Sequence, residues 1–502
     1  MRLLKAAMLG LSVLTAAGAA QAAGTLRIGL QDDPDRLDPA LGGTFAGRIV
    51  FASLCDKLVD LTAKLDFAPQ LATAWSWSAD GRALTMTLRQ GVTFHDGEPM
   101  TAEAVRDNLE RYRSAPESVR KAELKAVSAI EVVDAQTVRL VLSQPFAPLI
   151  AVLSDRAGMM VSPKAVARLG KDFFTAPVCS GPFRFTERVA QDRIVLDRFP
   201  GYWNAGAIHL DRVVFRPIAD TTVRLVNLQA GQLDMLEELA PSDAGKVKAD
   251  AKLRLAAVTG LGYAAINFNV GHGPRADTPI GRDPRIRAAL EAAIDRDVIN
   301  KVVMDGLFVP DNQTELPDSR YFNPKVPVPP RDLARAKALL KEAGVEHPSF
   351  EFKVANTPRD VQVVEVIQAM AAEAGFDIKV SAGEVNANIE AMNRGDYQAH
   401  LNTWSGRSDP DFNISIFIAC DGFQNWGKYC NPKLQEVLER GRAVTDPAQR
   451  QALYHQAVEI YAQDRAILYL YHPTWLFAHS AALQGFVTVP DGIIRPQGLR
   501  LE

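Results

Sequence analysis

The sequence lacks the features that mark membrane-embedded, nucleic-acid-binding and repetitive proteins. Beyond its first 22 residues, no apolar run approaches the roughly 20 residues that a spanning helix needs. The formal net charge is −3 and no basic run is present, so nothing indicates a nucleic-acid partner. Internal repeats and low-complexity tracts are missing as well. What remains is a globular chain of 502 residues, 47% hydrophobic and 23% charged, long enough for more than one core.

Catalytic motifs are also missing. The sequence has no G-x-S-x-G elbow, no H-E-x-x-H helix and no phosphate-binding P-loop. Ser118 to Lys121 matches S-x-x-K, but its partner motifs are absent, so chance explains the match better. With no C-x-x-C and no paired His at ligand spacing, we expect no metal and no cofactor. His272 is the one histidine considered as a ligand contact, against the alternative of a solvated loop residue.

The first 22 residues have the form of an export signal. Arg2 and Lys5 precede an apolar stretch of about 15 residues, and Ala20-Gln21-Ala22 follows as an A-x-A cleavage site. An uncleaved membrane anchor is the alternative, although the stretch is short for a spanning helix. No cysteine stands at the cleavage site, which argues against a lipid anchor. We therefore expect a soluble, periplasmic mature protein that begins near Ala23.

An exported chain meets an oxidising compartment, where its four cysteines can pair. Cys420 and Cys430 enclose the short loop DGFQNWGKY, and we expect a disulfide between them. Closing such a loop stabilises a protein by about 2–3 kcal/mol. Cys55 and Cys179 are far apart in the sequence, so a second disulfide and two free buried thiols both stay open.

The two halves of the chain differ in their patterns. The first half alternates polar and apolar residues around turn signals, which predicts strands and hairpins. From about residue 283, helix starts of the form Asp-Pro or Asn-Pro recur, at Asp283, Asn431 and Asp446. Residues 350–404 then read as β-α-β-α-β, the pattern of a parallel sheet with crossover helices. The predicted fold class is α/β.

The loop after the third of these strands is the first candidate site. It reads WSGRSDPD, from Trp404 to Asp411. Ligands of open α/β sheets bind beyond the carboxyl ends of strands, so we expect Trp404 to wall a cleft and Arg407 to bind an anionic group, most simply a carboxylate. Asp409 and Asp411 would hold the guanidinium or meet a cationic part of the ligand. The alternative is a solvent-facing turn in which Arg407 pairs with Asp409, since Ser, Gly, Asp and Pro are turn residues.

A second candidate follows the first predicted strand. The stretch GGTFAG places Thr44 and Phe45 in a glycine-rich loop before a helix. By the same strand-end argument, Thr44 could hydrogen-bond a ligand and Phe45 could stack on it. The alternative is a turn that merely caps the next helix.

Five stretches, in this order, carry a family resemblance: GVTFHDGEPMTAEAVRDNLER, APVCSGPFRF, RFPGYWN, DPRIRAALEAAIDRDVI and NPKLQEVLERGRAVTDPAQRQALYHQAVEIYAQD. Together they resemble family 5 of the bacterial extracellular solute-binding proteins. These proteins serve ABC importers of dipeptides, oligopeptides, nickel complexes and related solutes. The resemblance covers essentially the whole chain after the export signal.

The resemblance implies a two-lobe periplasmic binding protein of class II, the large type, with a hinge between its lobes. Lobe I would comprise residues 23–269 and 480–502, with a subdomain inserted at about 61–168, and lobe II would comprise residues 270–479. The protein would capture a peptide or another small polar solute between the lobes and catalyse nothing. Its partners would be the ABC permease and ATPase of the inner membrane, and it would be a monomer. The competing hypothesis is an exported hydrolase or transferase; a ligand-presenting partner of a chemoreceptor would use the same fold.

The candidate loop departs from the family pattern. In the dipeptide- and oligopeptide-binding members, an Asp in this loop meets the amino terminus of the peptide. Here Arg407 stands at about that place, and the loop is one residue shorter. The resemblance therefore supports the solute-binding class without extending to free-peptide specificity.

Overall fold

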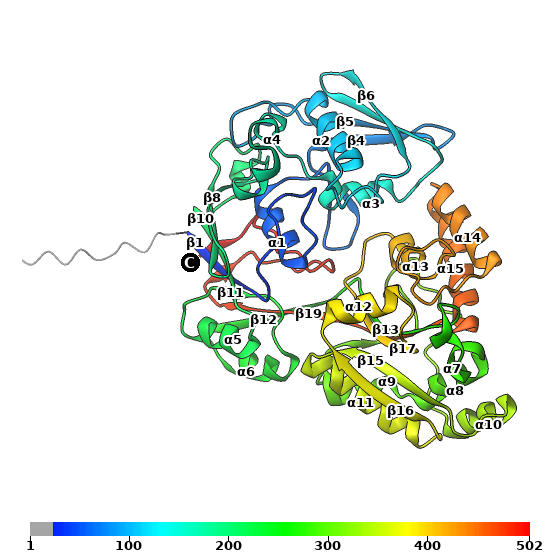
Figure 1. The fold of residues 1–502 in the computed structure, drawn as a ribbon. Helices are drawn as coiled ribbons and strands as arrows, with labels where there is room; N and C mark the ends of the chain where they lie inside the picture. The colour runs from blue at the N-terminus through cyan, green and yellow to red at the C-terminus, as the bar shows by residue number, and fades with distance from the viewer. Residues whose placement is uncertain (1–23) are drawn as a thin grey trace, which may run out of the picture.

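The computed structural model describes residues 24–502, apart from the side chain of Asn386, and shows two lobes built on separate sheets (Figure 1). The export signal predicted at residues 1–22 lies outside the described residues. The first lobe is built on a seven-stranded sheet of order β12-β19-β11-β1-β10-β9-β8, in which β1 runs parallel to β10 and β11. Its strands are β1 (Thr25–Leu30), β8 (Phe183–Val189), β9 (Arg193–Arg198), β10 (Arg212–Pro217), β11 (Met235–Leu236), β12 (Leu253–Thr259) and β19 (Thr474–Ser480).

A smaller antiparallel sheet of order β4-β5-β7-β6 forms a subdomain of the first lobe, at the top of Figure 1. One face of this sheet packs on α2 and encloses a hydrophobic core of its own. The predicted hairpin turn falls between β4 and β5, where Gly81 has a φ of +67°. The strands and helices of this part are β4 (Ala72–Trp77), β5 (Ala83–Leu88), β6 (Val127–Asp134), β7 (Thr137–Leu142), α2 (Ala102–Ser114) and α3 (Leu149–Leu153). The helix α4 (Pro163–Leu169) packs instead on the core of the seven-stranded sheet.

The second lobe is built on a six-stranded sheet of order β14-β18-β13-β17-β15-β16. The strand β15 is parallel to β16 and β17, which confirms the predicted β-α-β-α-β unit. Asp283, Asn431 and Asp446 each cap a helix that has Pro at its first position, as predicted. The elements of this unit and the strands beside it are β13 (Tyr263–Phe268), β14 (Val309–Pro310), β15 (Ser349–Ala355), α11 (Pro358–Ala372), β16 (Asp377–Gly383), α12 (Val385–Asn393), β17 (Ala399–Trp404) and β18 (Ile467–His472).

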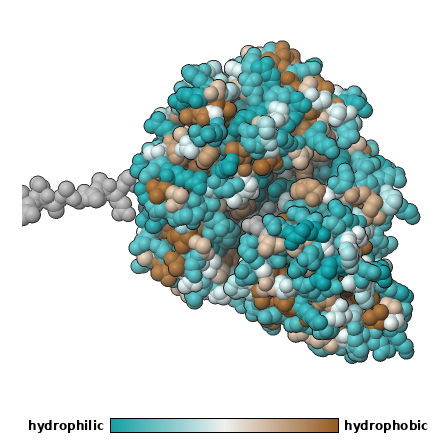
Figure 2. All heavy atoms as spheres, viewed as in Figure 1, coloured by the Kyte–Doolittle hydropathy of each residue, from teal (hydrophilic) through white to brown (hydrophobic). Residues whose placement is uncertain are grey.

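The remaining elements cover the sheets or join them. In the first lobe these are α1 (Phe45–Leu54), β2 (Val59–Leu61), β3 (Phe67–Pro69), α5 (Thr221–Gln229), α6 (Ala244–Ala249), β20 (Leu483–Gln484) and β21 (Arg500–Leu501). In the second lobe they are α7 (Pro279–Arg282), α8 (Pro284–Ala293), α9 (Arg296–Val303), α10 (Leu333–Ala343), α13 (Pro410–Ile418), α14 (Pro432–Ala443) and α15 (Pro447–Asp464). The face in Figure 2 is mostly hydrophilic and is hollowed near its centre, where the lobes meet.

Two short connections carry the chain between the lobes. One is residues 260–262, between β12 and β13, and the other is Pro473, between β18 and β19. The N–H of Gly260 donates to the carbonyl oxygen of Pro473 (2.7 Å), so the two connections lie side by side. Both precede the crossings expected near residues 270 and 480.

Both cysteine pairs form disulfides. Cys420 and Cys430, with Cα atoms 4.5 Å apart, are joined as predicted. Cys55 and Cys179, with Cα atoms 4.9 Å apart, are also joined, which resolves the open alternative in favour of a second bridge.

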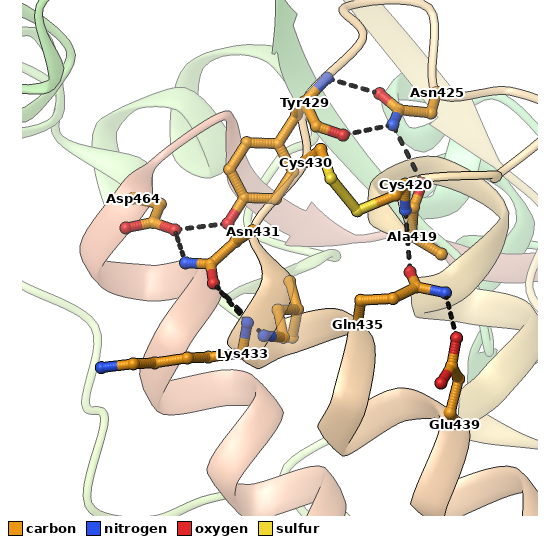
Figure 3. Close-up of a disulfide and its surroundings, with 11 residues drawn as sticks. Ala419, Cys420, Asn425, Tyr429, Cys430, Asn431, Lys433, Gln435, Glu439 and Asp464 are labelled. Atoms are coloured by element: carbon orange, nitrogen blue, oxygen red, sulfur yellow. Dashed lines mark hydrogen bonds between the residues drawn. A yellow bond between two sulfur atoms is a disulfide. The ribbon is translucent and has the colours of Figure 1, made fainter.

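The loop closed by the Cys420–Cys430 bond is braced by side chains (Figure 3). Asn425 donates to the carbonyl oxygens of Ala419 and Tyr429, and the Tyr429 hydroxyl bonds Asp464 at the end of α15. These contacts anchor the loop to the body of the second lobe.

Candidate binding cleft

Charged contacts between the lobes mark a shared cleft at the ends of the strands. Arg407 follows β17, and its Nε lies 3.8 Å from an Asp155 carboxylate oxygen of the first lobe. Arg359 opens α11 after β15 and interacts electrostatically with Glu238, which follows β11. The carboxyl ends of parallel strands from both lobes therefore face one space, which is where open α/β sheets bind ligands.

The outer rim of this cleft is closed by a second set of contacts. The N–H of Ala147, just before α3, donates to the Arg442 carbonyl oxygen at the end of α14 (2.8 Å). Beside it, the rings of Phe146 and Phe412 meet edge to face with centroids 6.3 Å apart. The structure thus shows the two lobes in contact on the side away from the connections.

Asn413 holds the backbone of the candidate loop in place. Its Oδ1 accepts hydrogen bonds from the Arg407 N–H (2.8 Å) and from Trp404 Nε1 (3.1 Å). Its Nδ2 donates to the Arg407 carbonyl (3.0 Å) and to Glu315 (2.8 Å), whose pKa burial raises to about 8. Asn413 and Glu315 could not be found from the sequence, because no motif marks a buried amide that holds a loop.

Gly406 fixes where this loop lies. Its φ is +79°, and a Cβ at this position would come within 2.2 Å of the Leu261 backbone in the first connection between the lobes. Only glycine fits such a close approach without strain. The loop is therefore pressed against the connection, and the next residue, Arg407, is placed beside the cleft.

The Arg407 side chain is partly buried but remains available. Its guanidinium lies over the Trp404 ring, 4.6 Å from the centroid, and donates to the Gly406 carbonyl (2.6 Å) and to Ser405 Oγ (3.2 Å). Its side chain is 24% exposed. Burial, helped by the positive charge of Arg48, lowers the pKa of Arg407 to about 10, so the group stays cationic at neutral pH.

Asp409 and Asp411 bind other arginines. Both oxygens of Asp409 accept from Arg450 on α15, at 2.7 Å each. Asp411 accepts from Arg442 Nε (2.9 Å) on α14. The expectation that they hold the Arg407 guanidinium is therefore wrong, and so is the alternative of an Arg407–Asp409 turn. Contact of either carboxylate with a ligand stays a prediction.

Thr44 and Phe45 have structural partners. Thr44 caps α1 by accepting the Gly47 N–H (3.2 Å), and its hydroxyl donates to Asp35 (3.0 Å). Phe45 stacks on Trp475, with centroids 4.6 Å apart and rings 5° from parallel. The capping role is thus present, and ligand contact by either residue stays a prediction.

A group of charged side chains in the first lobe faces Arg407. Arg48 on α1 pairs with Asp155 (3.2 Å), and Arg120 pairs with Glu123 (2.7 Å). We call this group, together with Arg407 and the neighbouring Arg156, the interlobe arginine cluster: Arg48, Arg120, Arg156 and Arg407 with Asp155 and Glu123. Its first-lobe members lie far apart along the chain, so no motif in the sequence indicates that they meet.

Other residues considered in the sequence lie away from the cleft or serve the fold. His272 follows β13, which runs antiparallel to β17, so His272 lies at the opposite end of these strands from Trp404; its Nδ1 pairs with the Trp426 carbonyl (2.9 Å). A ligand contact in this cleft is therefore wrong for His272. Ser118 and Lys121 each bond a backbone carbonyl (2.7 Å), in keeping with a chance S-x-x-K match.

Residues 24–502 show neither of two features that would indicate another function. No group of three or more His, Cys, Asp or Glu among them is arranged to hold a metal ion. None of the helices in this range has the length and apolarity needed to cross a membrane.

A sequence profile of the bacterial extracellular solute-binding proteins, family 5, matches residues 66–425. The chain belongs to this family. The glutathione-binding protein GsiB of Pectobacterium atrosepticum is 29% identical over 468 residues, which cover 91% of this chain and 90% of that protein. GsiB of Salmonella typhi is also 29% identical, over 501 residues that cover 97% and 96% of the two chains.

Solved structures agree with this assignment. The periplasmic binding protein DppA of Helicobacter pylori, in complex with the peptide STSA, superposes with a TM-score of 0.83 at 25% identity over 95% of this chain and 98% of its own. CtaP of Listeria monocytogenes, at 23% identity, has the same fold, with a TM-score of 0.86 over 95% and 99% of the two chains.

Family membership confirms two predictions. The chain has the two-lobe fold of the periplasmic binding proteins, and it is a solute-binding component of an ABC importer. The exported-enzyme hypothesis finds no support in these comparisons.

Proposed function

We propose that this protein captures a peptide-like, carboxylate-bearing solute between its lobes in the periplasm and delivers it to an ABC permease and ATPase. The observation that carries the proposal is the setting of Arg407. Its guanidinium stands at a strand end in the cleft, is partly exposed and is stacked on Trp404. Among the described residues, its one ion pair is the long contact to Asp155 of the other lobe. Such a cation can offer its planar fork to a carboxylate.

The relatives suggest the first probe. GsiB is named for glutathione, and DppA holds the peptide STSA. Glutathione is a tripeptide with two carboxylates, and either could bind a partly exposed guanidinium in the cleft. Trp404 and Phe45 would supply apolar walls, and Thr44 a hydroxyl. The carboxylates of Asp409 and Asp411 would support the position of the loop without needing to contact the solute, because Arg450 and Arg442 already bind them.

Capture would proceed by closure about the two connections. Residues 260–262 and Pro473 are the places where the chain leaves one sheet for the other, and we propose that the lobes rotate about them. The contact between Phe146 and Phe412 would form on closing and break on opening. A solute that binds the closed form should also raise the melting temperature, because it binds the native and not the unfolded chain.

Native mass spectrometry of protein taken from the periplasm tests the proposal directly. We expect a co-purified mass of peptide size that carries a carboxylate. After its removal, glutathione should raise the melting temperature and reduce the radius of gyration in small-angle scattering. If neither glutathione nor other carboxylate-bearing peptides change either quantity, the proposal fails. A product formed from the solute would support an enzyme instead.

The maturation and assembly of the protein are part of the same proposal. We infer that the export signal is removed near Ala23 and that the mature protein is a soluble monomer. Intact mass and light scattering of the secreted protein check both points. An uncleaved chain in the membrane fraction, or a stable dimer, would contradict them.

A further inference from the structure

The interlobe arginine cluster holds more positive than negative charge. Four guanidinium groups face the carboxylates of Asp155 and Glu123, so the cluster itself has two positive charges in excess. The nearby Asp491 carboxylate also interacts with Arg48, but its ion pair is with Arg495 (2.7 Å). In the first lobe, the side chains of Arg48, Arg120 and Arg156 are between 4% and 10% exposed. Buried cations without counterions are costly, so a folded cluster of this kind favours an added anion.

The hydrogen-bonding capacity of the cluster is also incompletely used. Arg48 Nη1, Arg120 Nε and Arg156 Nε are buried and make no hydrogen bond within the described part of the chain, although Arg156 Nε lies 3.7 Å from an Asp155 oxygen. Other nitrogens of the same side chains donate to Asp155, Glu123 and the Gly42 carbonyl. The cluster therefore keeps three buried N–H donors, from three segments of the chain, that have capacity left for the oxygen atoms of an anion.

The electrostatics point the same way. Burial and the charges of Arg120 and Arg48 lower the pKa of Arg156 to about 9. Burial alone would raise the pKa of Asp155, but Arg48, Arg156 and Arg407 hold it well below its usual range. Asp155 is thus fully ionised at neutral pH and still does not balance the arginines around it.

We propose that this cluster is a subsite for a doubly charged oxyanion, so that the protein selects solutes whose acidic end carries two negative charges. Two neighbouring carboxylates and one phosphate group share this chemistry. The inference rests on the proposed function, because Arg407 joins the first-lobe arginines only when the lobes are together. It goes further by giving the first lobe a share in recognition and by setting the charge of the solute.

The first experiment tests the subsite with small anions, so the natural solute need not be known. The melting temperature is measured in succinate, in phosphate and in acetate at matched ionic strength, with chloride as reference. We expect succinate or phosphate to raise it by at least about 1 °C more than acetate does. Arg48→Gln should remove this difference, and Arg106→Gln, which deletes an exposed arginine of α2 that pairs with Asp107, should keep it.

A loss of the dianion effect in both variants, or in neither, would show general ionic binding and overturn the inference. If Arg48→Gln does not fold, Arg407→Gln, on the other lobe, must remove the difference instead. Equal shifts by acetate and succinate in the wild type would also overturn it.

The second experiment separates the inference from the proposed function. The tripeptides Ala-Ala-Glu and Ala-Ala-Gln have nearly the same shape and differ by one carboxylate. We expect calorimetry to give about tenfold tighter binding of Ala-Ala-Glu, and Arg48→Gln to reduce this ratio to about one. Equal affinities for the two tripeptides would overturn the dianion subsite but would still support peptide capture. Binding of succinate without binding of either peptide would support the subsite and count against peptide capture.

Discussion

Two arginines of the second lobe stand beside the same loop and are placed very differently. Arg450 is 7% exposed, binds Asp409 through two parallel hydrogen bonds and donates its Nε to the Gly441 carbonyl. Arg407 is 24% exposed, lies over an indole ring and reaches one carboxylate, across the cleft, at 3.8 Å. The first guanidinium has all its charge balanced within its lobe, and the second does not.

The pKa values express the same difference. Burial opposes ionisation of both groups, but Asp409 raises the pKa of Arg450, whereas burial and Arg48 lower that of Arg407 to about 10. An arginine with its own buried carboxylate serves the fold. An arginine whose ionisation burial disfavours, and whose one counterion is 3.8 Å away on the other lobe, is suited to a ligand.

Removing Arg450 should have the largest effect, and it should fall on stability. Arg450→Met leaves the buried Asp409 carboxylate without a cation, which costs about 3–5 kcal/mol. Urea unfolding at pH 7 measures the change. Arg440→Met, on the exposed side of α14, is the matched control and should cost about 0.5 kcal/mol or less. If the variant keeps its stability and loses solute affinity, Arg450 is a binding residue, and its contrast with Arg407 is wrong.

Glu315, which accepts a hydrogen bond from the Asn413 that holds the Arg407 loop, should affect stability and make it depend on pH. Burial raises its pKa from 4.5 to about 8, so the folded state keeps a proton that the unfolded state loses above pH 4.5. Stability therefore falls as the pH rises from about 5 to 8, at about 1.4 kcal/mol per unit of raised pKa at most. Glu315→Gln should remove a few kcal/mol of this fall in paired urea titrations. Parallel pH curves for the two proteins would refute the argument.

Removing Arg407 should change affinity and leave the fold alone. Arg407→Ala should weaken solute binding by roughly ten- to a hundred-fold, at about 1.4 kcal/mol per decade, because a charge-assisted pair to a carboxylate is lost. Its melting temperature without solute should barely move. Arg394→Ala, an exposed arginine at the end of α12, is the control. Unchanged affinity in calorimetry would return Arg407 to the status of a surface residue.

The smallest effect is expected at the rim of the cleft. Phe146→Ala removes the edge-to-face contact with Phe412, which is worth about 0.5–1.5 kcal/mol beyond its buried area. If this contact forms on closure, as we propose, solute should leave about two to ten times faster in stopped-flow experiments. Phe423→Ala, in the disulfide-closed loop and 70% exposed, should leave the rate unchanged. Equal rates in both variants would show that the rim does not contribute to retention.

The sequence predicted what local patterns can encode. The helix caps at Asp283 and Asn431 and the parallel unit around β15 follow from residues close together in the chain. The strand-end rule predicted a cleft beside Arg407, and the structure places its guanidinium 3.8 Å from Asp155 of the other lobe, while its contact with a ligand stays a prediction. The Cys420–Cys430 disulfide was predictable for the same reason, because the two cysteines are only 10 positions apart and a short loop brings them together.

Partners that come from distant segments were not predictable. Asp409 meets Arg450 across 41 positions, and Arg48 meets Asp155 across 107. Which arginine meets Asp409 or Asp411 depends on how α14 and α15 pack against the loop, and the sequence pattern of the loop does not predict that packing. His272 was misplaced because the crossing between lobes was expected some residues too late, which put an outer turn of the second lobe near the cleft.

The Cys55–Cys179 bond spans 124 positions and therefore encloses the whole of the four-stranded subdomain and α2 in one covalent ring. A protease that cuts a surface turn of this subdomain would not release a fragment, because both cut ends stay tied to the rest of the protein. The nicked molecule would keep its mass apart from one added water. Its two pieces would separate on a denaturing gel when reductant is present and not otherwise. During export, Cys55 must also wait for the entire subdomain to emerge before its partner arrives.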